Sequence, residues 1–218
     1  MNHSDTSGTW SSATTCCRSE PAVLLPLTRA FPARYGAPVL RSVDPAIFRR
    51  RYFTYCLDCD FCHDWCCQFG VDVDRYHVDR ILAHADALEA FLGVPRDQWF
   101  TGEVEQDDDV PGGETWRTRV VDGACVFLNR CGRGCRLHAF CVEQGIEHRE
   151  LKSIVDVLFP LTFEEGVLCP AGEAAEEELV CLRTGPTLYR GVRSEIAYYF
   201  GAELVGELDR LEALDSAG

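Results

Sequence analysis

The sequence predicts an α+β fold: a small cysteine-rich domain with a β-hairpin and C-terminal helices. Three observations support this class. The cysteines gather in two groups, a strand–turn–strand pattern leads into the second group, and the last thirty or so residues repeat apolar positions at helical spacing. The chain has 218 residues, of which 46% are hydrophobic and 26% charged, so it is long enough to bury a core without disulfide staples.

Three parts are expected along the chain. Residues 1–22 are rich in serine and threonine and are expected to form a disordered tail. Cys16 and Cys17 lie in this tail, far from other metal-ligand types, and are expected to be ordinary thiols. Residues 23–54 form an N-terminal extension. Residues 55–218 form the cysteine-cluster domain with its C-terminal helices.

The first long element of this domain is a predicted helix. Asp74 is a suitable N-cap, apolar residues follow at helical spacing as far as Leu92, and Gly93 provides a stop. His77 and His84 share one face of this helix. They are expected to be surface or boundary histidines rather than metal ligands.

A β-hairpin is predicted before the second cysteine group. Residues 101–114 contain six acidic residues and no basic one, which is typical of a solvated loop. Thr115 to Val121 then alternates as a strand does, Asp122-Gly123 is a tight-turn signal, and residues 125–128 form a second apolar strand. The hairpin therefore delivers Cys125.

The remaining elements alternate extended and helical patterns. A helix is expected to begin near Leu137. Residues 154–163 read as extended, and a turn returns the chain to residues 167–169. Two amphipathic helices, at about 187–200 and 202–214, close the chain.

The cysteines carry the strongest chemical signal. Thirteen are present, and nine of them fall into two groups, the first being Cys56, Cys59, Cys62, Cys66 and Cys67 and the second Cys125, Cys131, Cys135 and Cys141, with His138 inside it. Several thiolates that converge on one point bind zinc or an iron–sulfur cluster. A disulfide network is the main competing interpretation.

Common templates do not fit these spacings. The gap of 57 residues between Cys67 and Cys125 is longer than that of paired zinc knuckles. The order Cys-x2-Cys-x3-Cys differs from that of radical S-adenosylmethionine enzymes. The chain also shows no phosphate loop, dinucleotide fingerprint or serine nucleophile elbow.

Three short motifs resemble the YkgJ-type cysteine-cluster family, which is described as zinc- or iron-chelating. They are C-H-D-W-C-C at 62–67, C-V-F-L at 125–128 and C-R-L-H at 135–138. The resemblance covers roughly residues 55–165. It implies ligands at Cys62, Cys66, Cys67, Cys125 and Cys135, and Cys59 matches an upstream cysteine of many members.

The chain departs from that family at one position. Phe159-Pro160 matches a downstream motif, but Asp156 stands near the place where the family has another cysteine. Either Asp156 is an oxygen ligand, or the ligand is missing, or the site is completed by one of Cys131, Cys141, Cys169 and His138.

The resulting prediction is a metal-binding protein whose process is unknown. The predicted metal ligands are Cys59, Cys62, Cys66, Cys67, Cys125 and Cys135. An iron–sulfur cluster is favoured over zinc, because the nearby cysteines outnumber the four ligands of one zinc ion.

Two other functions stay open. One is a metal-dependent enzyme or an accessory protein in protein or peptide modification, with His63, Asp64 and His138 as acid–base candidates. Some relatives of the resembled family are attached to protein-lysine methylation, which agrees with this alternative. The other is a thiol-redox protein that uses the Cys56-x2-Cys59 spacing.

The composition also indicates which partners the protein can bind and where it is located. The net charge of −14 argues against binding to nucleic acid or to an anionic membrane surface. No apolar run is long enough to span a membrane, and no secretory signal is visible at the start. A cytoplasmic location is expected, and a protein partner is left open.

Overall fold

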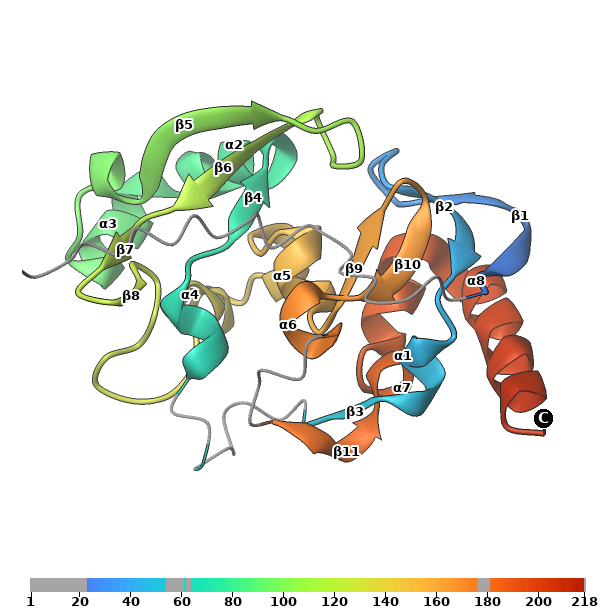
Figure 1. Ribbon diagram of the computed structural model, residues 1–218. Helices are drawn as coiled ribbons and strands as arrows, with labels where there is room; N and C mark the ends of the chain where they lie inside the picture. Colours follow the sequence, from blue (N-terminus) through green and yellow to red (C-terminus); the bar gives the residue numbers. More distant parts are fainter. Residues whose placement is uncertain (1–22, 54–60, 62–63, 176–180, 218) are drawn as a thin grey trace, which may run out of the picture.

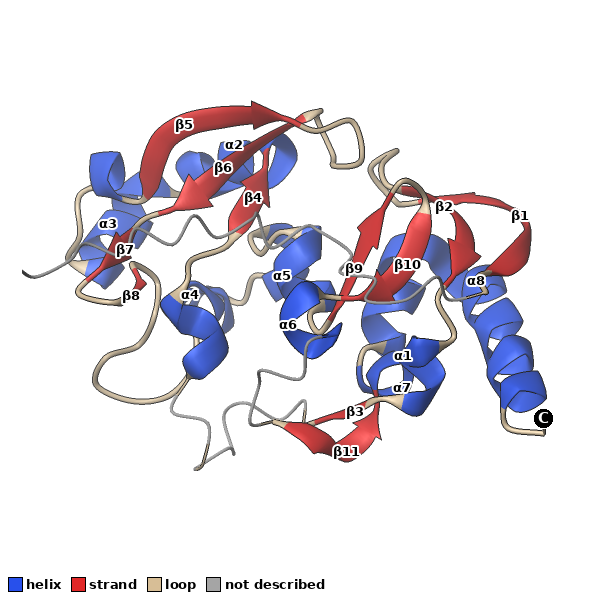
Figure 2. Ribbon diagram, in the orientation of Figure 1, coloured by secondary structure: helices blue, strands red, loops and turns tan. Residues whose placement is uncertain are grey.

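The computed structural model describes residues 23–53, 61, 64–175 and 181–217. It is a mixed α+β structure in which short helices pack around small sheets, as Figures 1 and 2 show. The predicted fold class is therefore confirmed. The predicted tail at 1–22, with Cys16 and Cys17, lies outside the described residues.

One apolar core forms around a four-stranded sheet of order β1-β2-β10-β9. Strands β2 and β10 are parallel, and the other neighbours are antiparallel. Helices pack against this sheet from the C-terminal part of the chain. The bounds are Leu25–Pro32 for β1, Val39–Val43 for β2, Leu161–Glu164 for β9, Val167–Pro170 for β10, Ala46–Arg49 for α1, Leu188–Gly191 for α7 and Arg193–Asp215 for α8.

The long helix α8 is interrupted at Gly201, whose φ of 85° and ψ of 171° are not helical. Glycine adopts such a backbone without a steric penalty. The interruption falls between the two predicted C-terminal helices, at about 187–200 and 202–214. The first of these begins as the short helix α7, which is separated from α8 at Val192.

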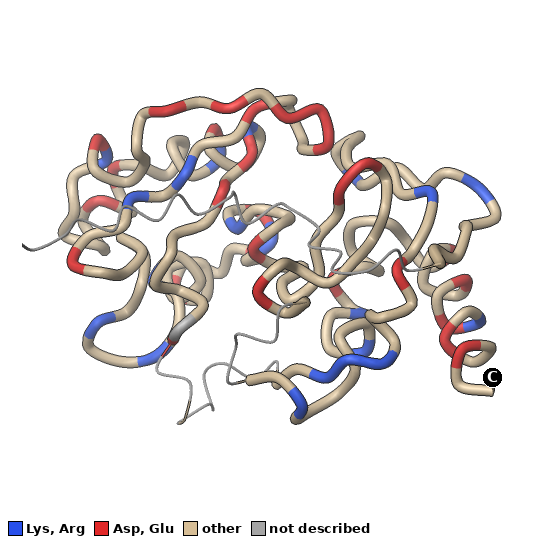
Figure 3. Tube along the Cα trace, in the orientation of Figure 1, with Lys and Arg blue, Asp and Glu red and all other residues tan. Residues whose placement is uncertain are grey.

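A second apolar core lies beside a three-stranded antiparallel sheet of order β4-β6-β5. Acidic side chains follow β5 and the loop after it (Figure 3). The bounds are Asp72–Asp74 for β4, Phe100–Gln106 for β5, Glu114–Thr118 for β6, Arg75–Ala83 for α2, Ala85–Leu92 for α3, Arg96–Gln98 for η3 and Arg136–Gln144 for α4. The prediction of a loop over 101–114 is thus wrong for its first six residues, which belong to β5, and for Glu114, which belongs to β6.

The predicted helix from Asp74 to Leu92 forms as two pieces. The Asp74 side chain accepts a hydrogen bond from the His77 backbone N–H at 3.1 Å, and Gly93 ends α3 with a φ of 68°. His84 has a non-helical backbone and separates α2 from α3. His84 is exposed, as predicted, but His77 is fully buried, so its prediction as a surface or boundary residue is wrong.

The predicted β-hairpin is present but short. Val120–Val121 (β7) pairs with Ala124–Cys125 (β8), and Asp122 and Gly123 turn the chain with φ values of 46° and 73°. Two successive residues with positive φ are typical of a tight hairpin turn. Thr115–Thr118 belongs to β6 instead, where it pairs with β4 and β5.

Residues 154–158 are helical (α5, Ile154–Leu158) rather than extended, so this prediction is wrong. The Ser153 hydroxyl accepts a hydrogen bond from the Asp156 N–H at 3.3 Å and caps the helix. Strands β9 and β10 then form the predicted return. The other elements are Arg51–Tyr52 for β3, Trp65–Gln68 for η2, His148–Glu150 for η4, Gly172–Ala175 for α6 and Leu182–Thr187 for β11.

Among the described residues, no helix is both long enough and apolar enough to span a bilayer.

Candidate metal centre

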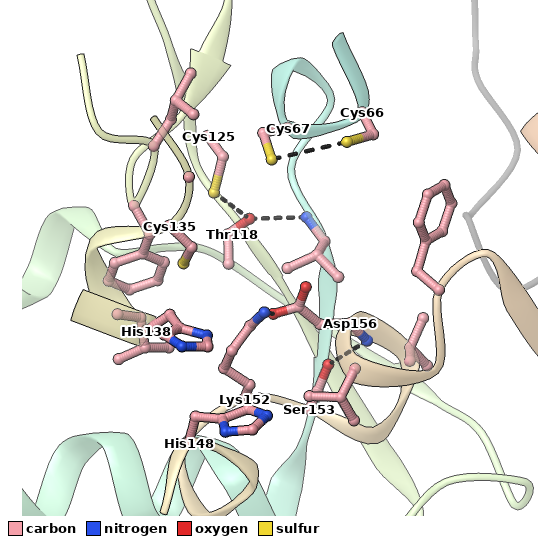
Figure 4. Close-up of a pocket in the computed structure, with 18 of the residues that line it drawn as sticks. Cys66, Cys67, Thr118, Cys125, Cys135, His138, His148, Lys152, Ser153 and Asp156 are labelled. Carbon is pink, nitrogen blue, oxygen red and sulfur yellow. Dashed lines mark hydrogen bonds and ion pairs between the residues drawn. The ribbon is translucent and has the colours of Figure 1, made fainter. Parts of the chain in front are cut away.

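A cavity of about 810 Å³ lies between the two apolar cores. Its wall takes Val73 and Phe127 from one core and Val155 and Leu161 from the other. Figure 4 shows four cysteine thiols in this pocket, with an ammonium–carboxylate pair and two imidazoles below them in this view. The four thiols are those of Cys66, Cys67, Cys125 and Cys135.

Cys66 and Cys67 are held by the short 3₁₀ helix η2. Asp64 enters this helix with a φ of 56°, and its carbonyl accepts a hydrogen bond from the Cys67 N–H at 2.8 Å. The two sulfur atoms lie 3.9 Å apart. The hydrogen bond with Cys66, together with burial, raises the pKa of the Cys67 thiol well above its usual range.

Cys125 is placed by the hairpin strand β8. Its buried thiol donates to the Thr118 hydroxyl at 3.4 Å, and this hydroxyl also accepts a hydrogen bond from the Val71 N–H at 2.9 Å. Burial raises the pKa of Cys125 to about 11. The strand therefore presents a protonated thiol at neutral pH when no metal is bound.

Cys135 sits immediately before the helix α4 and forms an isolated bridge with Leu128. Burial raises the pKa of the Cys135 thiol, although the Lys152 ammonium opposes this effect. The backbone N–H groups of His138 and Leu137 also lower this pKa, because they donate to the sulfur.

Lys152 and Asp156 form an ion pair on the cavity wall. The Lys152 Nζ lies 3.3 Å from the Asp156 Oδ2. Burial lowers the pKa of Lys152, but nearby negative charge, first that of Asp156, raises it above its usual range, so Lys152 is a cation at neutral pH. Lys152 is the only lysine of the chain, but a single residue has no spacing pattern that points to a site.

Two imidazoles also line the cavity. The His138 and His148 rings stack with centroids 4.8 Å apart. Burial lowers the pKa of both rings, and the nearby Lys152 and Arg149 cations lower it further for His138 and His148 respectively. Neutral imidazoles can accept protons or bind a metal ion.

The cavity brings together four of the six predicted ligands. Cys66, Cys67, Cys125 and Cys135 line it, whereas Cys59 and Cys62 lie outside the described residues. His63, an acid–base candidate, also lies outside them, and Asp64 is on the cavity wall.

The five residues that were candidates to complete the ligand set differ in whether they line the cavity. Asp156 and His138 line the cavity. Cys131 is exposed, Cys141 is buried in the second apolar core, and Cys169 is disulfide-bonded; none of these three lines the cavity.

The thiols share a cavity without meeting at one point. Within residues 23–53, 61, 64–175 and 181–217, no three histidine, cysteine, aspartate or glutamate side chains lie close enough together to hold a metal ion. Lys152, His148 and the Thr118 hydroxyl are members of the site that the sequence did not single out.

No family model matches the chain, and no solved structure matches it. The resemblance to the YkgJ-type family therefore rests on three sequence motifs. The class of site is defined by the chemistry of the cavity: one buried and three partly buried thiols from two distant chain segments, with ionisable side chains beside them.

Proposed function

We propose that this protein binds a metal through Cys66, Cys67, Cys125 and Cys135, with Cys59 and Cys62 as further donors. The observation that carries this proposal is the shared cavity. Two cysteine groups separated by 57 residues in sequence contribute thiols to one wall. Free cysteines that served only as small apolar residues would not need to face one cavity.

The spacing of the adjacent thiols fits two ligands of one zinc ion. Two thiolates bound to one tetrahedral zinc ion at about 2.3 Å lie roughly 3.8 Å apart. The distance between the sulfur atoms of Cys66 and Cys67 is 3.9 Å. An iron–sulfur cluster is the alternative cofactor, since six predicted thiol donors exceed the need of one zinc ion.

Metal content tests the proposal. Protein purified without oxygen should contain about one zinc ion per chain, measured by mass spectrometry. About two or more iron atoms per chain would support the cluster instead. Absence of both metals, together with failure to take up added zinc or iron, would overturn the proposal.

Two variants locate the site. Cys66→Ser and Cys125→Ser each remove one thiol from the cavity wall, and each should lower metal content and thermal stability together. Cys131→Ser is the matched control, because Cys131 is an exposed thiol outside the cavity. Equal metal content in all three variants would place the site elsewhere.

A metal-dependent enzyme is the second candidate function. It is favoured by the volume of the cavity, about 810 Å³, which is within the range of small-ligand sites. The His138 and His148 imidazoles beside the thiols supply a possible general base. An accessory role in protein or peptide modification fits the same arrangement.

Cobalt substitution separates the two functions. Cobalt(II) bound by four thiolates gives intense absorption bands that depend on its ligands. A closed structural site should not change its spectrum when cyanide is added, whereas an open catalytic site should.

The thiol-redox function has little support among the described cysteines, and Cys56 and Cys59, whose spacing suggested it, lie outside the described residues. Reactive cysteines have a lowered pKa, since the thiolate is the nucleophile. Burial instead raises the pKa of Cys125 to about 11, and that of Cys135 is also raised.

A further inference from the structure

Almost all basic residues of this chain are arginine. Lysine and arginine together number 21, and only one of them, Lys152, is a lysine. This residue lines the cavity that holds the thiols, and its side chain is only 14% exposed. Burial of an ammonium group is costly unless nearby negative charge compensates for it.

The nearest compensating charge is that of Asp156. Asp156, on the first turn of α5, lies 3.3 Å from the Lys152 Nζ. The thiols of Cys135 and Cys67 line the same cavity as the Lys152 ammonium. Figure 4 shows the Lys152 ammonium directed at the Asp156 carboxylate, with Cys135 to the left of this pair and Cys67 above it in this view.

The charge balance of a metal site makes this cation important. A zinc ion with four thiolate ligands carries a net charge of about −2. Among the described residues, Lys152 and Arg133 are the only lysine or arginine side chains that line the cavity. Arg133 pairs with Asp64 at 3.1 Å. Lys152 is therefore the cation that faces Asp156 and the thiols together.

We propose that Lys152 is a positioning residue of the thiolate centre: its ammonium compensates the negative charge on the metal-bound sulfurs and holds Asp156 as an ion-pair partner outside the metal's ligand set. This inference rests on the proposed metal-binding function. It also places Asp156, which the sequence left as a candidate oxygen ligand, outside the ligand set.

The choice of lysine has a physical reason. Its ammonium is a compact charge with three donors that rotate together, whereas a guanidinium is wide and planar. A compact cation can approach a carboxylate and sulfur ligands at once in a confined space. Side chains that contact the metal ligands without binding the metal typically change metal affinity by about 10- to 100-fold when they are removed.

Zinc affinity, measured by competition with a chromophoric chelator, tests the role of the charge. Lys152→Met should weaken zinc binding by about tenfold or more, and Lys152→Arg should restore part of the loss. Arg130→Met is the control, because it removes an exposed positive charge that does not line the cavity. Equal affinity of wild type and Lys152→Met would overturn the inference.

Asp156→Asn separates the two roles of the carboxylate. If Asp156 is only the partner of Lys152, this variant should bind zinc as tightly as wild type or more tightly, because a negative charge near the thiolates has been removed. A loss of about tenfold or more would mean that Asp156 is a metal ligand, and the inference would be wrong.

A spectroscopic signal comes directly from the single lysine. Growth on lysine labelled with ¹⁵N at Nζ gives one side-chain resonance, which reports the surroundings of Lys152. Zinc should shift this resonance in wild type and in Cys131→Ser. An unchanged resonance on zinc-loaded protein would contradict the inference even if Lys152→Met does not fold.

The two proposals fail differently. If wild type binds neither zinc nor iron, the proposed function itself is wrong. If wild type binds metal, yet neither Lys152→Met nor the ¹⁵N signal responds, only the role of Lys152 is wrong.

Discussion

Asp64 and Arg133 form an ion pair of 3.1 Å that joins the two cysteine groups across the cavity. Asp64 directly precedes the helix that carries Cys66 and Cys67, and Arg133 lies two residues before Cys135. The two side chains are 11% and 28% exposed, so the pair is partly shielded from water. It fixes the distance between segments that would have to hold one metal.

The charge of Asp64 is therefore expected to support both stability and metal binding. Asp64→Asn removes the charge and keeps a residue that tolerates the positive φ of this position. It should lower the free energy of unfolding by about 1 kcal/mol and weaken zinc binding, as measured by denaturation and by chelator competition.

Asp122→Asn is the control for this prediction. Asp122 also has a positive φ but is exposed in the hairpin turn. Its replacement should change stability by no more than about 0.5 kcal/mol. The same loss in both variants would show that the ion pair is unimportant.

The metal-free protein should lose stability at high pH. Burial raises the pKa of Cys125 to about 11, whereas an unfolded cysteine titrates at about 8.5. Above about 8.5 the unfolded state loses this proton while the folded state retains it, so stability falls as the pH rises toward about 11. Urea unfolding at several pH values measures this effect, and Cys125→Ala should reduce it.

Zinc affinity should depend on pH in the opposite direction and weaken as the pH falls. Metal ligation requires thiolates, so zinc binding releases protons from thiols such as Cys67 and Cys135, whose pKa values are raised in the free protein. Zinc affinity should therefore fall as the pH falls below neutral. An affinity independent of pH between about 5 and 8 would argue against thiolate ligands.

A buried hydrogen-bonded pair anchors the segment that leads to Lys152. The His77 Nδ1 lies 2.7 Å from Asp74, and its Nε2 lies 3.2 Å from the Arg149 carbonyl. Both ring nitrogens face acceptors, and both side chains are almost completely buried. Asp74→Asn should lower the free energy of unfolding by about 1–3 kcal/mol, because it disturbs the hydrogen bond of a buried ring.

Asp79→Asn is the comparison on the same helix. Its side chain is 59% exposed and pairs with Arg75 at the surface, so the expected loss is about 0.3–0.5 kcal/mol. Thermal or urea denaturation of the two variants compares them directly. A small loss for Asp74→Asn would mean that the buried pair contributes little.

Gly70 keeps the cavity wall in place. A Cβ atom here would lie 2.9 Å from the Thr118 carbonyl oxygen and 3.0 Å from its hydroxyl, and the residue has a φ of 74°. Gly70→Ala should therefore displace the hydroxyl that accepts from Cys125. The expected loss is about 2–4 kcal/mol from strain and overpacking together, with weaker zinc binding.

Gly145→Ala isolates the backbone contribution. Gly145 has a similar φ of 67°, but no atom lies within 4 Å of the added Cβ. The expected loss is about 1–2 kcal/mol, without an effect on zinc binding. If both alanine variants bind zinc equally well, the contact between Gly70 and Thr118 does not control the site.

Local signals in the sequence predicted several elements correctly. The Asp74 cap, the stop at Gly93, the turn at Asp122-Gly123 and the break near Gly201 each depend on the residue itself and its close neighbours. The same holds for the hairpin placement of Cys125.

Elements that depend on distant contacts were not predictable in this way. The burial of His77 requires the carbonyl of Arg149, which lies 72 residues away in the chain. The strand β5 looked like a loop because its acidic side chains face solvent while its backbone pairs with β6. The helix α5 has only five residues, and its β-branched apolar side chains and the proline that follows are also typical of a short strand, so the Ser153 cap is the one local sign of the helix.

The candidate site was predicted through its chemistry rather than its geometry. Shared ligand type suggested that Cys66, Cys67, Cys125 and Cys135 belong together, and all four line one cavity. Lys152 was overlooked because a single lysine carries no spacing pattern, and only the folded chain places it beside the thiols.

X-ray absorption at the zinc edge tests the central claim most directly. Protein loaded with one equivalent of zinc should show about four sulfur ligands at about 2.3 Å, and Cys66→Ser should lower the sulfur count. A first shell made mainly of nitrogen and oxygen atoms, unchanged in Cys66→Ser, would contradict the account.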